Sequence, residues 1–502
     1  SLIVEAVNNG TLDEKVLDNL VKDILSLVFK ANSQKKKRAD QKKEKHHEFA
    51  RQVAAESVTL LKNDKDILPV TKAKYKKVAI IGEFAMAPRY QGNGSSEVKP
   101  TQLDNALEII KSEYGKDIQI SYAQGYKLTD DNDFSLIEEA KNVAGKADIV
   151  LIFAGLPLHY ESEGIDRTHI NMPASHNKLI SDVAEIQKNT VVVLTNGSAI
   201  AMPWSEKVSG ILETWLGGQA GAGGIADVLF GKVSPSGKLA ETFPVKLEDT
   251  PAFFNFPGEE GNVRYGEGIY VGYRYYDKKK IEPLFPFGYG LSYTNFEYSD
   301  LQLASTNITD KDGLELTVKI KNTGSVKGKE VVQLYVSDKK STLQRPEKEL
   351  KKFAKVELAP GEEKTLSFKL DGRDFSYFDS RRNMWIAESG EFVISVGASS
   401  RDIRQSEVVQ LQSTQKVPLA FDEYTFFTEY WNNKQTREYL KQLVPNWIKG
   451  WTPEGKSLDE ASFPGFFIDH PMIKFPYITN GEISHAQVKE LVEKCKGLTY
   501  TP

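Results

Sequence analysis

Cysteine is almost absent from this sequence. Cys495 is the only one among 502 residues, so no disulfide can form within the chain. Because disulfides are typical of proteins from oxidising compartments, this scarcity favours a cytoplasmic over a secreted location. No signal peptide is readable at Ser1, which is not an initiator methionine. Export therefore stays undecided, with the cytoplasm favoured.

Long apolar runs and a strong charge imbalance are also missing. Apolar stretches such as 147–155 have strand length, far short of the roughly 20 residues that cross a bilayer. The net charge of −4 gives no electrostatic reason to expect a nucleic acid. A basic run at Gln34–Lys45 is interleaved with acidic residues, and we interpret it as a solvated helix and loop. We expect neither a membrane nor a nucleic acid partner.

Metal and nucleotide-triphosphate motifs are not recognisable. His46 and His47 are adjacent, so they cannot share one helix face as a zinc-binding pair does. The other histidines lack ligand spacing, and the chain has no Gly-Lys-Ser/Thr loop. We therefore expect no metal site and no cofactor.

One glycine pattern keeps a rival class open. Gly221–Ala226 matches the dinucleotide-binding pattern, and Glu241 lies near the offset of its acidic partner. A nicotinamide-dependent oxidoreductase is therefore an alternative. The fingerprint normally follows the first strand of its sheet, however, whereas this one follows the last. Close packing of a strand against a helix is the simpler interpretation.

Between residues 71 and 245, apolar β-branched runs alternate with helical stretches. Continuous apolar strands alternating with helices predict an α/β domain with a parallel sheet buried on both faces. Ligands of such sheets bind where loops leave the carboxyl ends of the strands. The predicted strands lie at Val78–Gly82, Ile118–Tyr122, Ala147–Ala154, Thr190–Thr195 and Ile211–Leu216.

The pattern changes on both sides of this domain. Residues 1–70 are predicted to be helical, and residues 246–285 form a Pro-, Gly- and aromatic-rich linker. In 286–412 apolar and polar residues alternate, as in Leu314–Ile320, which predicts an antiparallel β-sandwich. Residues 413–502 read as a helical tail that packs on the rest and forms no independent domain.

Ionisable residues gather in the loop after the strand at 149–154. Glu161, Glu163, Asp166 and Arg167 lie within seven positions. A carboxyl group here could act as a general acid if a partner domain desolvates it. An ordinary solvated loop tied by an ion pair is equally open. A second loop, Arg89–Ser96, has glycines and serines that could approach a polar ligand, although a plain flexible turn is the simpler interpretation.

Taken in order, these segments resemble the second half of glycoside hydrolase family 3. The first 32 residues are similar to the helix that follows the barrel in that family, and the sandwich is similar to its fibronectin type III-like domain. The segments that carry the resemblance are Ala54–Asn63, Glu163–Arg167, Gly197-Ser198, Pro203-Trp204, Leu216–Gly221, Gly237–Pro244, Tyr273–Tyr276 and Pro286–Thr294.

The resemblance implies a function for the acidic loop. The general acid/base of the family is a glutamate followed by glycine, and Glu163 occupies that position; Glu161 is the second candidate. It also implies a structural role for the turn at Gly221–Ala226. The resemblance points to a set of substrate-binding residues: Arg89, Gln91, Asn93, Ser95, Tyr160 and Arg167.

The resemblance also implies a partner. Retaining glycosidases need a nucleophile beside the acid, and the family supplies an aspartate from an N-terminal (β/α)₈ barrel of about 250 residues. No such barrel is readable here, so we expect a truncated chain that is nearly inactive alone.

The complete enzyme is expected to be an exo-acting β-glycosidase, specifically a β-glucosidase, acting on oligosaccharides or glycosides. The sequence is compatible with a homodimer. The alternative is a non-catalytic carbohydrate-binding or scaffolding protein of the same descent.

Overall fold

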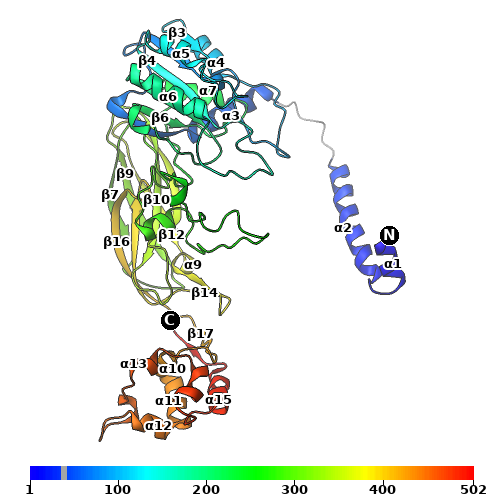
Figure 1. The fold of residues 1–502 in the computed structure, drawn as a ribbon, viewed down its shortest axis with the longest axis vertical. Coiled ribbons are helices and arrows are strands. Elements are labelled where there is room, and N and C mark those ends of the chain that lie inside the picture. Colours follow the sequence, from blue (N-terminus) through cyan, green and yellow to red (C-terminus); the bar gives the residue numbers. More distant parts are fainter. Residues whose placement is uncertain (35–41) are drawn as a thin grey trace.

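Three folded parts follow one another along the chain (Figure 1). The structure is a computed structural model that describes residues 1–34 and 42–502. Each part has a hydrophobic core of its own. The predicted solvated loop at 34–45 falls largely on residues 35–41, outside the described residues. Within the described ranges, no helix is both long enough and apolar enough to span a membrane.

The chain begins with helices. Helix α2 begins after Asp13, whose carboxylate accepts a hydrogen bond from the Lys15 amide 3.0 Å away, and none of its residues is buried. Helix α3, in contrast, packs against α7. The bounds are α1 (Leu2–Asn8), α2 (Glu14–Ser33), α3 (Lys43–Ser57) and α7 (Gly221–Leu229).

The prediction that residues 1–70 are helical is wrong near the end of that range. Thr59–Asn63 forms strand β1, which pairs antiparallel with Gly210–Glu213. The side chains of Thr59, Leu60 and Leu61 are buried, because this run covers the open edge of the sheet. A short apolar run fits a buried strand as well as the end of a helix, so periodicity alone did not separate the two.

The α/β domain is built on a six-stranded sheet in the order β1-β6-β5-β4-β2-β3, parallel except for β1. This confirms the predicted fold class. Every residue of β4 and β5 is buried, because helices cover both faces of such a sheet. The elements are β1 (Thr59–Asn63), β2 (Lys77–Ile81), β3 (Gln119–Ala123), β4 (Ile149–Gly155), β5 (Thr190–Thr195), β6 (Gly210–Glu213), α4 (Ala106–Tyr114), α5 (Ile137–Ala144) and α6 (Ala174–Ile186).

The second part is the predicted β-sandwich. Two sheets, β11-β10-β15-β16-β8 and β12-β9-β7, enclose alternate residues of β9 such as Leu314, Leu316 and Val318. Helix α8 (Tyr273–Lys279) and a segment with little regular structure connect it to the α/β domain. The strands are β7 (Phe296–Leu303), β8 (Asn307–Thr309), β9 (Leu314–Asn322), β10 (Gly328–Asp338), β11 (Glu349–Leu358), β12 (Glu363–Leu370), β15 (Gly390–Gly397) and β16 (Ile403–Gln412).

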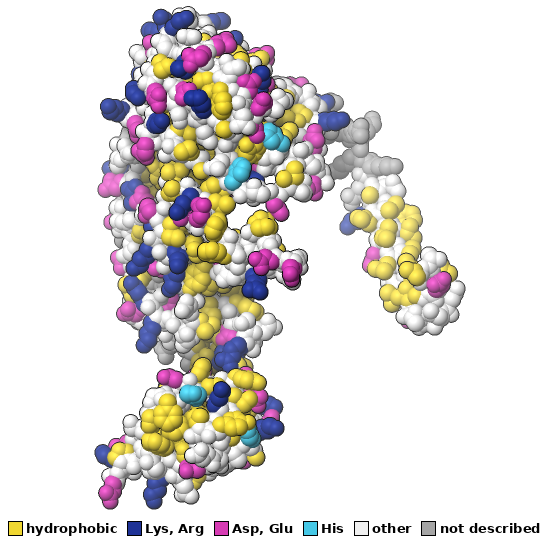
Figure 2. Space-filling view, viewed as in Figure 1, with side chains coloured by type: hydrophobic (Ala, Val, Ile, Leu, Met, Phe, Trp, Pro, Cys, Tyr) yellow, Lys and Arg dark blue, Asp and Glu magenta, His cyan; other side chains and the backbone are white. Residues whose placement is uncertain are grey.

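The C-terminal tail is helical, as predicted, but it has a core of its own. Phe427, Trp447, Phe463 and Phe475 pack together in it, and none of them belongs to the core of the sandwich. The tail therefore differs from the expectation that it only packs on the rest and forms no independent domain, because its aromatic residues bury one another. In Figure 2 apolar side chains also gather on its surface. Its elements are β17 (Val417–Pro418), α10 (Phe427–Asn432), α11 (Lys434–Leu443), α12 (Pro445–Gly450), α13 (Gly465–Ile468), α14 (Phe475–Ile478), α15 (His485–Cys495) and β18 (Thr499–Tyr500).

Arginines join the tail to the sandwich. A hairpin of β13 (Tyr377–Asp379) and β14 (Met384–Ile386) follows the short helix α9 (Gly372–Phe375). From its turn, Arg382 donates to the Pro418 carbonyl at 2.7 Å and Arg381 donates to the Ala420 carbonyl at 2.8 Å. The tail is therefore held at one end of the sandwich, with the α/β domain at the other end (Figure 1).

Glycines end two of the parallel strands. Gly155 closes β4 with φ +151, and Gly82 follows β2 with φ +116. A Cβ atom on Gly155 would lie 2.0 Å from the Thr195 carbonyl oxygen on β5. Only glycine lets the backbones approach so closely where the loops leave the sheet.

We expect Gly155→Ala to lower the free energy of unfolding of the α/β domain by about 3 kcal/mol, through strain and overpacking. The measurement is hydrogen exchange at the β4 and β5 amides, which isolates this domain from the other two. Gly145→Ala, in the same domain and with only ordinary contacts for a Cβ at 3.5 and 3.7 Å, is the control and should change stability by less than about 0.5 kcal/mol. Equal effects of the two variants would contradict the close approach.

Candidate functional site

Two loops meet at the carboxyl edge of the parallel sheet. The loop after β2 carries Arg89 and Asn93, and the loop after β4 carries Glu161 and Glu163. Strand β2 pairs with both β3 and β4, so the chain reverses its direction across the sheet between β2 and β4. At such a reversal the loops part and leave a crevice, which is where ligands of open α/β sheets bind.

Glu163 lies at the tip of its loop. Its carboxylate accepts a hydrogen bond from the Ser95 amide at 2.5 Å, and this bond lowers its pKa below the ordinary value. The side chain is exposed. Gly94, at φ +93, leaves room for it, since a Cβ there would meet the Glu163 side chain at 2.4 Å. The carboxyl group is thus placed by the neighbouring loop and still open to a ligand.

Glu161 is in the opposite situation, because its carboxylate is enclosed by donors. It accepts from Arg89 Nη1 at 2.7 Å, from the Gly197 amide at 2.8 Å and from the Ser198 hydroxyl. Burial raises its pKa, but the bonds from Ser198, Gly197 and Arg89 outweigh burial and leave the pKa lowered. An ionised, fully bonded carboxylate has no proton to donate. Glu161 therefore ties three loops together, and Glu163 is the carboxyl group of this loop that stays open to a ligand.

Arg167 completes this network from the other side. Its Nη1 donates to Ser198 Oγ at 2.7 Å and to the Ala199 carbonyl at 3.1 Å. Burial lowers the pKa of Arg167, which Glu161 partly offsets. The buried Nε and Nη2 atoms have no hydrogen-bond partner in the described part of the chain.

A cavity of about 690 Å³ brings five of the eight predicted site residues together. The other three predicted residues, Gln91, Ser95 and Tyr160, do not line the cavity. Gln91 exchanges two 3.0 Å hydrogen bonds with the Val98 backbone. Ser95 holds Glu163, and the Tyr160 hydroxyl donates to Asp131 at 3.1 Å. The five that line the cavity are Arg89, Asn93, Glu161, Glu163 and Arg167.

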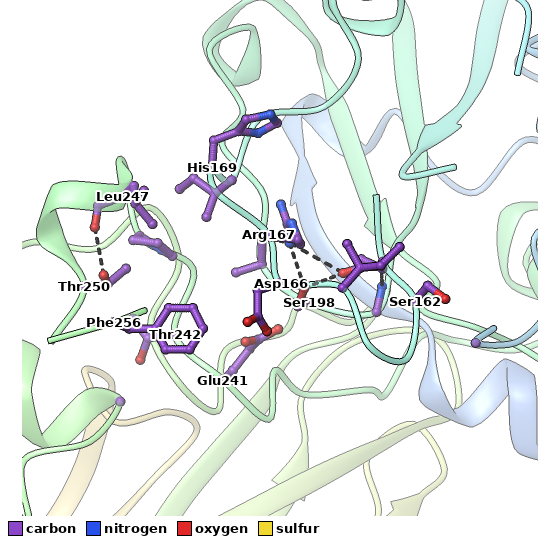
Figure 3. Close-up of a pocket in the computed structure, with 18 of the residues that line it drawn as sticks. Ser162, Asp166, Arg167, His169, Ser198, Glu241, Thr242, Leu247, Thr250 and Phe256 are labelled. Atoms are coloured by element: carbon purple, nitrogen blue, oxygen red, sulfur yellow. Dashed lines mark hydrogen bonds and ion pairs between the residues drawn. The ribbon is translucent and has the colours of Figure 1, made fainter. Parts of the chain in front are cut away.

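The cavity also contains residues that sequence reasoning did not identify as a site. Glu241, Thr242 and Phe256 also line it (Figure 3). Burial raises the pKa of Glu241 to about 6. In the sequence Glu241 was noticed only as an acidic partner for the glycine pattern. The one signal in the sequence for a site at Glu241 is its position in Gly237–Pro244, where a carboxylate stands among mostly apolar residues.

A buried carboxyl group supports the loop that holds Glu161. Glu213, at the end of β6, is fully buried, and burial raises its pKa to about 8. It accepts from Asn196 Nδ2 and from the Trp215 amide, both at 2.9 Å. Asn196 precedes Gly197 and Ser198, the two residues that bind Glu161. Through Asn196, Glu213 therefore fixes the start of the loop after β5, which binds Glu161.

The glycine pattern at Gly221–Ala226 serves helix packing. A Cβ on Gly224 would lie 2.7 Å from the Ala55 amide nitrogen of α3, and one on Gly223 would lie 2.8 Å from the Arg51 side chain. Glycine is needed here because α3 and α7 touch backbone to backbone. This accounts for the pattern without a dinucleotide.

Glu161 gives the fold a dependence on pH. A carboxyl whose folded pKa is lowered stabilises the fold fully above the unfolded pKa of about 4.3, and that contribution is lost as pH falls through the folded pKa. We expect Glu161→Gln to destabilise the α/β domain by about 2 kcal/mol at neutral pH. The difference from the wild type should shrink as pH falls below that unfolded value.

Unfolding measured across the acid range checks this expectation. Glu206→Gln is the control, since its side chain is 94% exposed and takes no part in the network. A difference between wild type and Glu161→Gln that stays constant across the acid range would contradict the assignment.

Comparison with known proteins places this site in a family. Residues 58–293 match the model for the glycosyl hydrolase family 3 C-terminal domain, and residues 330–400 match a fibronectin type III-like domain. The chain is 54% identical over 420 residues to thermostable beta-glucosidase B of Acetivibrio thermocellus, covering 84% of this chain and 55% of that protein. An exo-alpha-(1->6)-L-arabinopyranosidase of Bifidobacterium longum is 43% identical over 426 residues, covering 82% of this chain and 55% of that protein.

The structural comparison agrees. The crystal structure of a family 3 beta-glucosidase from Bifidobacterium adolescentis superposes with a TM-score of 0.80 at 42% identity, covering 88% of this chain and 64% of the other. The chain thus spans little more than half the length of the curated relatives named above. With its family 3 C-terminal α/β domain and the fibronectin type III-like domain after it, this chain belongs to glycoside hydrolase family 3.

Proposed function

We propose that this chain supplies the general acid/base, Glu163, of a retaining, exo-acting β-glycosidase with β-glucosides as its first candidate substrates. The observation that carries the proposal is the contrast between two carboxyl groups in one loop. Glu161 is enclosed by donors, whereas Glu163 is exposed at the edge of the cavity. The relatives named as beta-glucosidases support the substrate class.

The reaction needs a second carboxylate. In retaining glycosidases a nucleophile about 5–5.5 Å from the acid attacks the anomeric carbon, while the acid protonates the leaving oxygen and later deprotonates water. None of the folded parts in the described ranges is a (β/α)₈ barrel. We propose that an aspartate on such a barrel faces Glu163 in the working enzyme, outside these 502 residues.

The pKa of Glu163 must change in that assembly. In this chain the Ser95 amide lowers the pKa, which suits a carboxylate and not an acid. A domain that covers the loop would desolvate the carboxyl group, and a nearby nucleophilic carboxylate would disfavour its charge; both effects raise a pKa. The assembled site would therefore hold the proton that catalysis requires.

In the enzyme that includes the barrel, we expect Glu163→Gln to reduce kcat/KM for glycosides with poor leaving groups by about 10²- to 10⁴-fold. Aryl glycosides with good leaving groups should lose much less, because their oxygen needs little protonation. Steady-state kinetics on both substrate types provides the measurement, with Glu206→Gln as an exposed control. Equal losses on both types would remove the acid role from Glu163.

The 502-residue chain by itself is expected to show no measurable turnover, since it offers an acid without the proposed nucleophile. A sensitive assay with a fluorogenic β-glucoside tests this, with the barrel-containing enzyme as the positive control. Turnover by the isolated chain would overturn the proposed division of the two carboxylates. Sugar binding without turnover in the barrel-containing protein would favour the non-catalytic carbohydrate-binding alternative.

A further inference from the structure

Glu213 is a buried carboxyl group that the proposed reaction does not use. It ends β6, it is fully buried, and its hydrogen bonds come from the Asn196 side chain and the Trp215 amide. Its register partners, Thr59 of β1 and Leu194 of β5, carry no charge. No lysine or arginine in the described ranges forms an ion pair with it. Burying an ionised carboxyl group without a cation is costly, so this position favours the uncharged acid.

The charged groups that act most strongly on Glu213 are negative. They are Glu241, from the segment after α7, and Glu161, from the loop after β4. The cations Arg89 and Arg167 pair with Glu161 instead, at 2.7 and 3.5 Å. Burial, followed by the two carboxylates, raises the pKa of Glu213 to about 8, although its two hydrogen bonds oppose the shift. Glu213 is therefore mostly uncharged at neutral pH.

From this buried position Glu213 holds the loop after β5. Asn196 Nδ2 donates to Glu213 Oε2 at 2.9 Å and to the Ser198 carbonyl at 3.0 Å. The two residues that follow Asn196, Gly197 and Ser198, are the ones that bind Glu161. Glu213 does not line the cavity itself. It acts on Glu161 through this loop.

Glu213 also holds the loop after β6. Its Oε1 accepts a hydrogen bond from the Trp215 amide at 2.9 Å. Trp215 has φ +55, a left-handed conformation that bulky residues rarely adopt and that persists only when the surroundings support it. Beyond Trp215, Leu216 lines the cavity and the Gly218 amide donates to the Tyr90 carbonyl at 2.8 Å. The second loop therefore reaches the loop after β2.

The two loops belong to one ring of contacts at the carboxyl edge of the sheet. Tyr90 is adjacent to Arg89, which pairs with Glu161 at 2.7 Å. The loop that carries Arg89 continues to Ser95, whose amide donates to Glu163. Both branches that begin at the buried carboxyl group therefore end on the loops that place Glu163.

Loss of a proton from Glu213 to solvent would change this arrangement. The ionised group would be a buried charge repelled by Glu161 and Glu241, and it would gain stability where water could reach it. We propose that Glu213 is a positioning residue, which holds the loops after β5 and β6 in place while it is uncharged and releases them when it loses its proton. This inference rests on the proposed function, because the two loops place the residues assigned to that reaction.

The direction of the raised pKa fixes the pH range of the effect. A carboxyl group whose folded pKa is raised stabilises the closed loops fully below its unfolded pKa of about 4.3. That contribution is lost as pH rises through the folded pKa, which is about 8 for Glu213. Protection of the loop amides from hydrogen exchange should therefore fall between pH 5 and pH 8 and then level off.

Hydrogen exchange of the 502-residue chain tests this expectation. After correction for the intrinsic exchange rate, the amides of residues 197–199 and 215–218 should lose protection at least about tenfold between pH 5 and pH 8. In Glu213→Gln, which keeps the shape of the side chain and cannot ionise, protection of the same amides should not change with pH.

Asp148→Asn is the matched control. Asp148 also accepts two hydrogen bonds, from the Lys76 and Lys77 amides, but it precedes β4 at the opposite edge of the sheet. This variant should keep the pH dependence of the wild type. Constant protection in the wild type, a result that needs no variant to fold, would overturn the inference. So would the same pH dependence in Glu213→Gln.

The positioning role also has a kinetic readout in the barrel-containing enzyme. The ratio of kcat/KM at pH 9 to kcat/KM at pH 6 for 4-nitrophenyl β-glucoside should be at least about threefold higher in Glu213→Gln than in the wild type. Titration of Glu163 is common to both proteins and cancels from this comparison. Equal ratios would leave Glu213 a structural group and overturn its positioning role. If the wild type hydrolyses no glycoside, the proposed function fails instead, and hydrogen exchange still decides whether Glu213 releases the loops.

Discussion

The ion pair between Arg89 and Glu161 holds the carboxyl edge of this protein together. Its two members come from loops that follow β2 and β4, and their atoms approach to 2.7 Å. The side chain of Arg89 is only 3% exposed, and a pair with so little solvent stabilises a structure only when further hydrogen bonds complete it. Gly197 and Ser198 supply those bonds, so a third loop joins the same centre. The position of Glu163 depends on this arrangement.

The two glutamates illustrate how environment assigns different tasks to one residue type. They are two positions apart in the same loop, yet one is surrounded by donors and the other meets a single backbone amide. Both have lowered pKa values in this chain. On the proposed function, a domain that covers the loop would desolvate Glu163 and raise its pKa, whereas the partners of Glu161 are already in place.

The remaining two parts of the chain support the site from a distance. The β-sandwich packs around its own core, and its Lys348 and Arg401 both bind the buried Asp277 of α8 at 2.6 Å. Helix α8 carries Tyr276, which lines the cavity. The helical tail, held by arginines at the other end of the sandwich, adds a third independent core. The β-sandwich therefore supports the α/β domain on one side through α8. The carboxyl edge of the sheet, where the site lies, is left open.

The sequence by itself determined the layers and the location of the acidic loop. Continuous apolar strands such as β4 and β5, and the alternation in β9, reflect short-range periodicity, and burial of one or two faces dictates that periodicity directly. Position at the end of an apolar strand made the loop of Glu161 and Glu163 a candidate, and the family resemblance then selected Glu163.

Tertiary structure alone decided which residues share the cavity. Glu241, Thr242 and Phe256 share the cavity with Arg167 only because the chain returns to the same edge after two more strands and two helices. Strand β1 likewise needed an open sheet edge, and the tail needed its aromatic residues brought together. Such contacts join residues far apart in sequence, and local periodicity carries no information about them. Packing of the whole chain, and no single segment, fixes where those side chains meet.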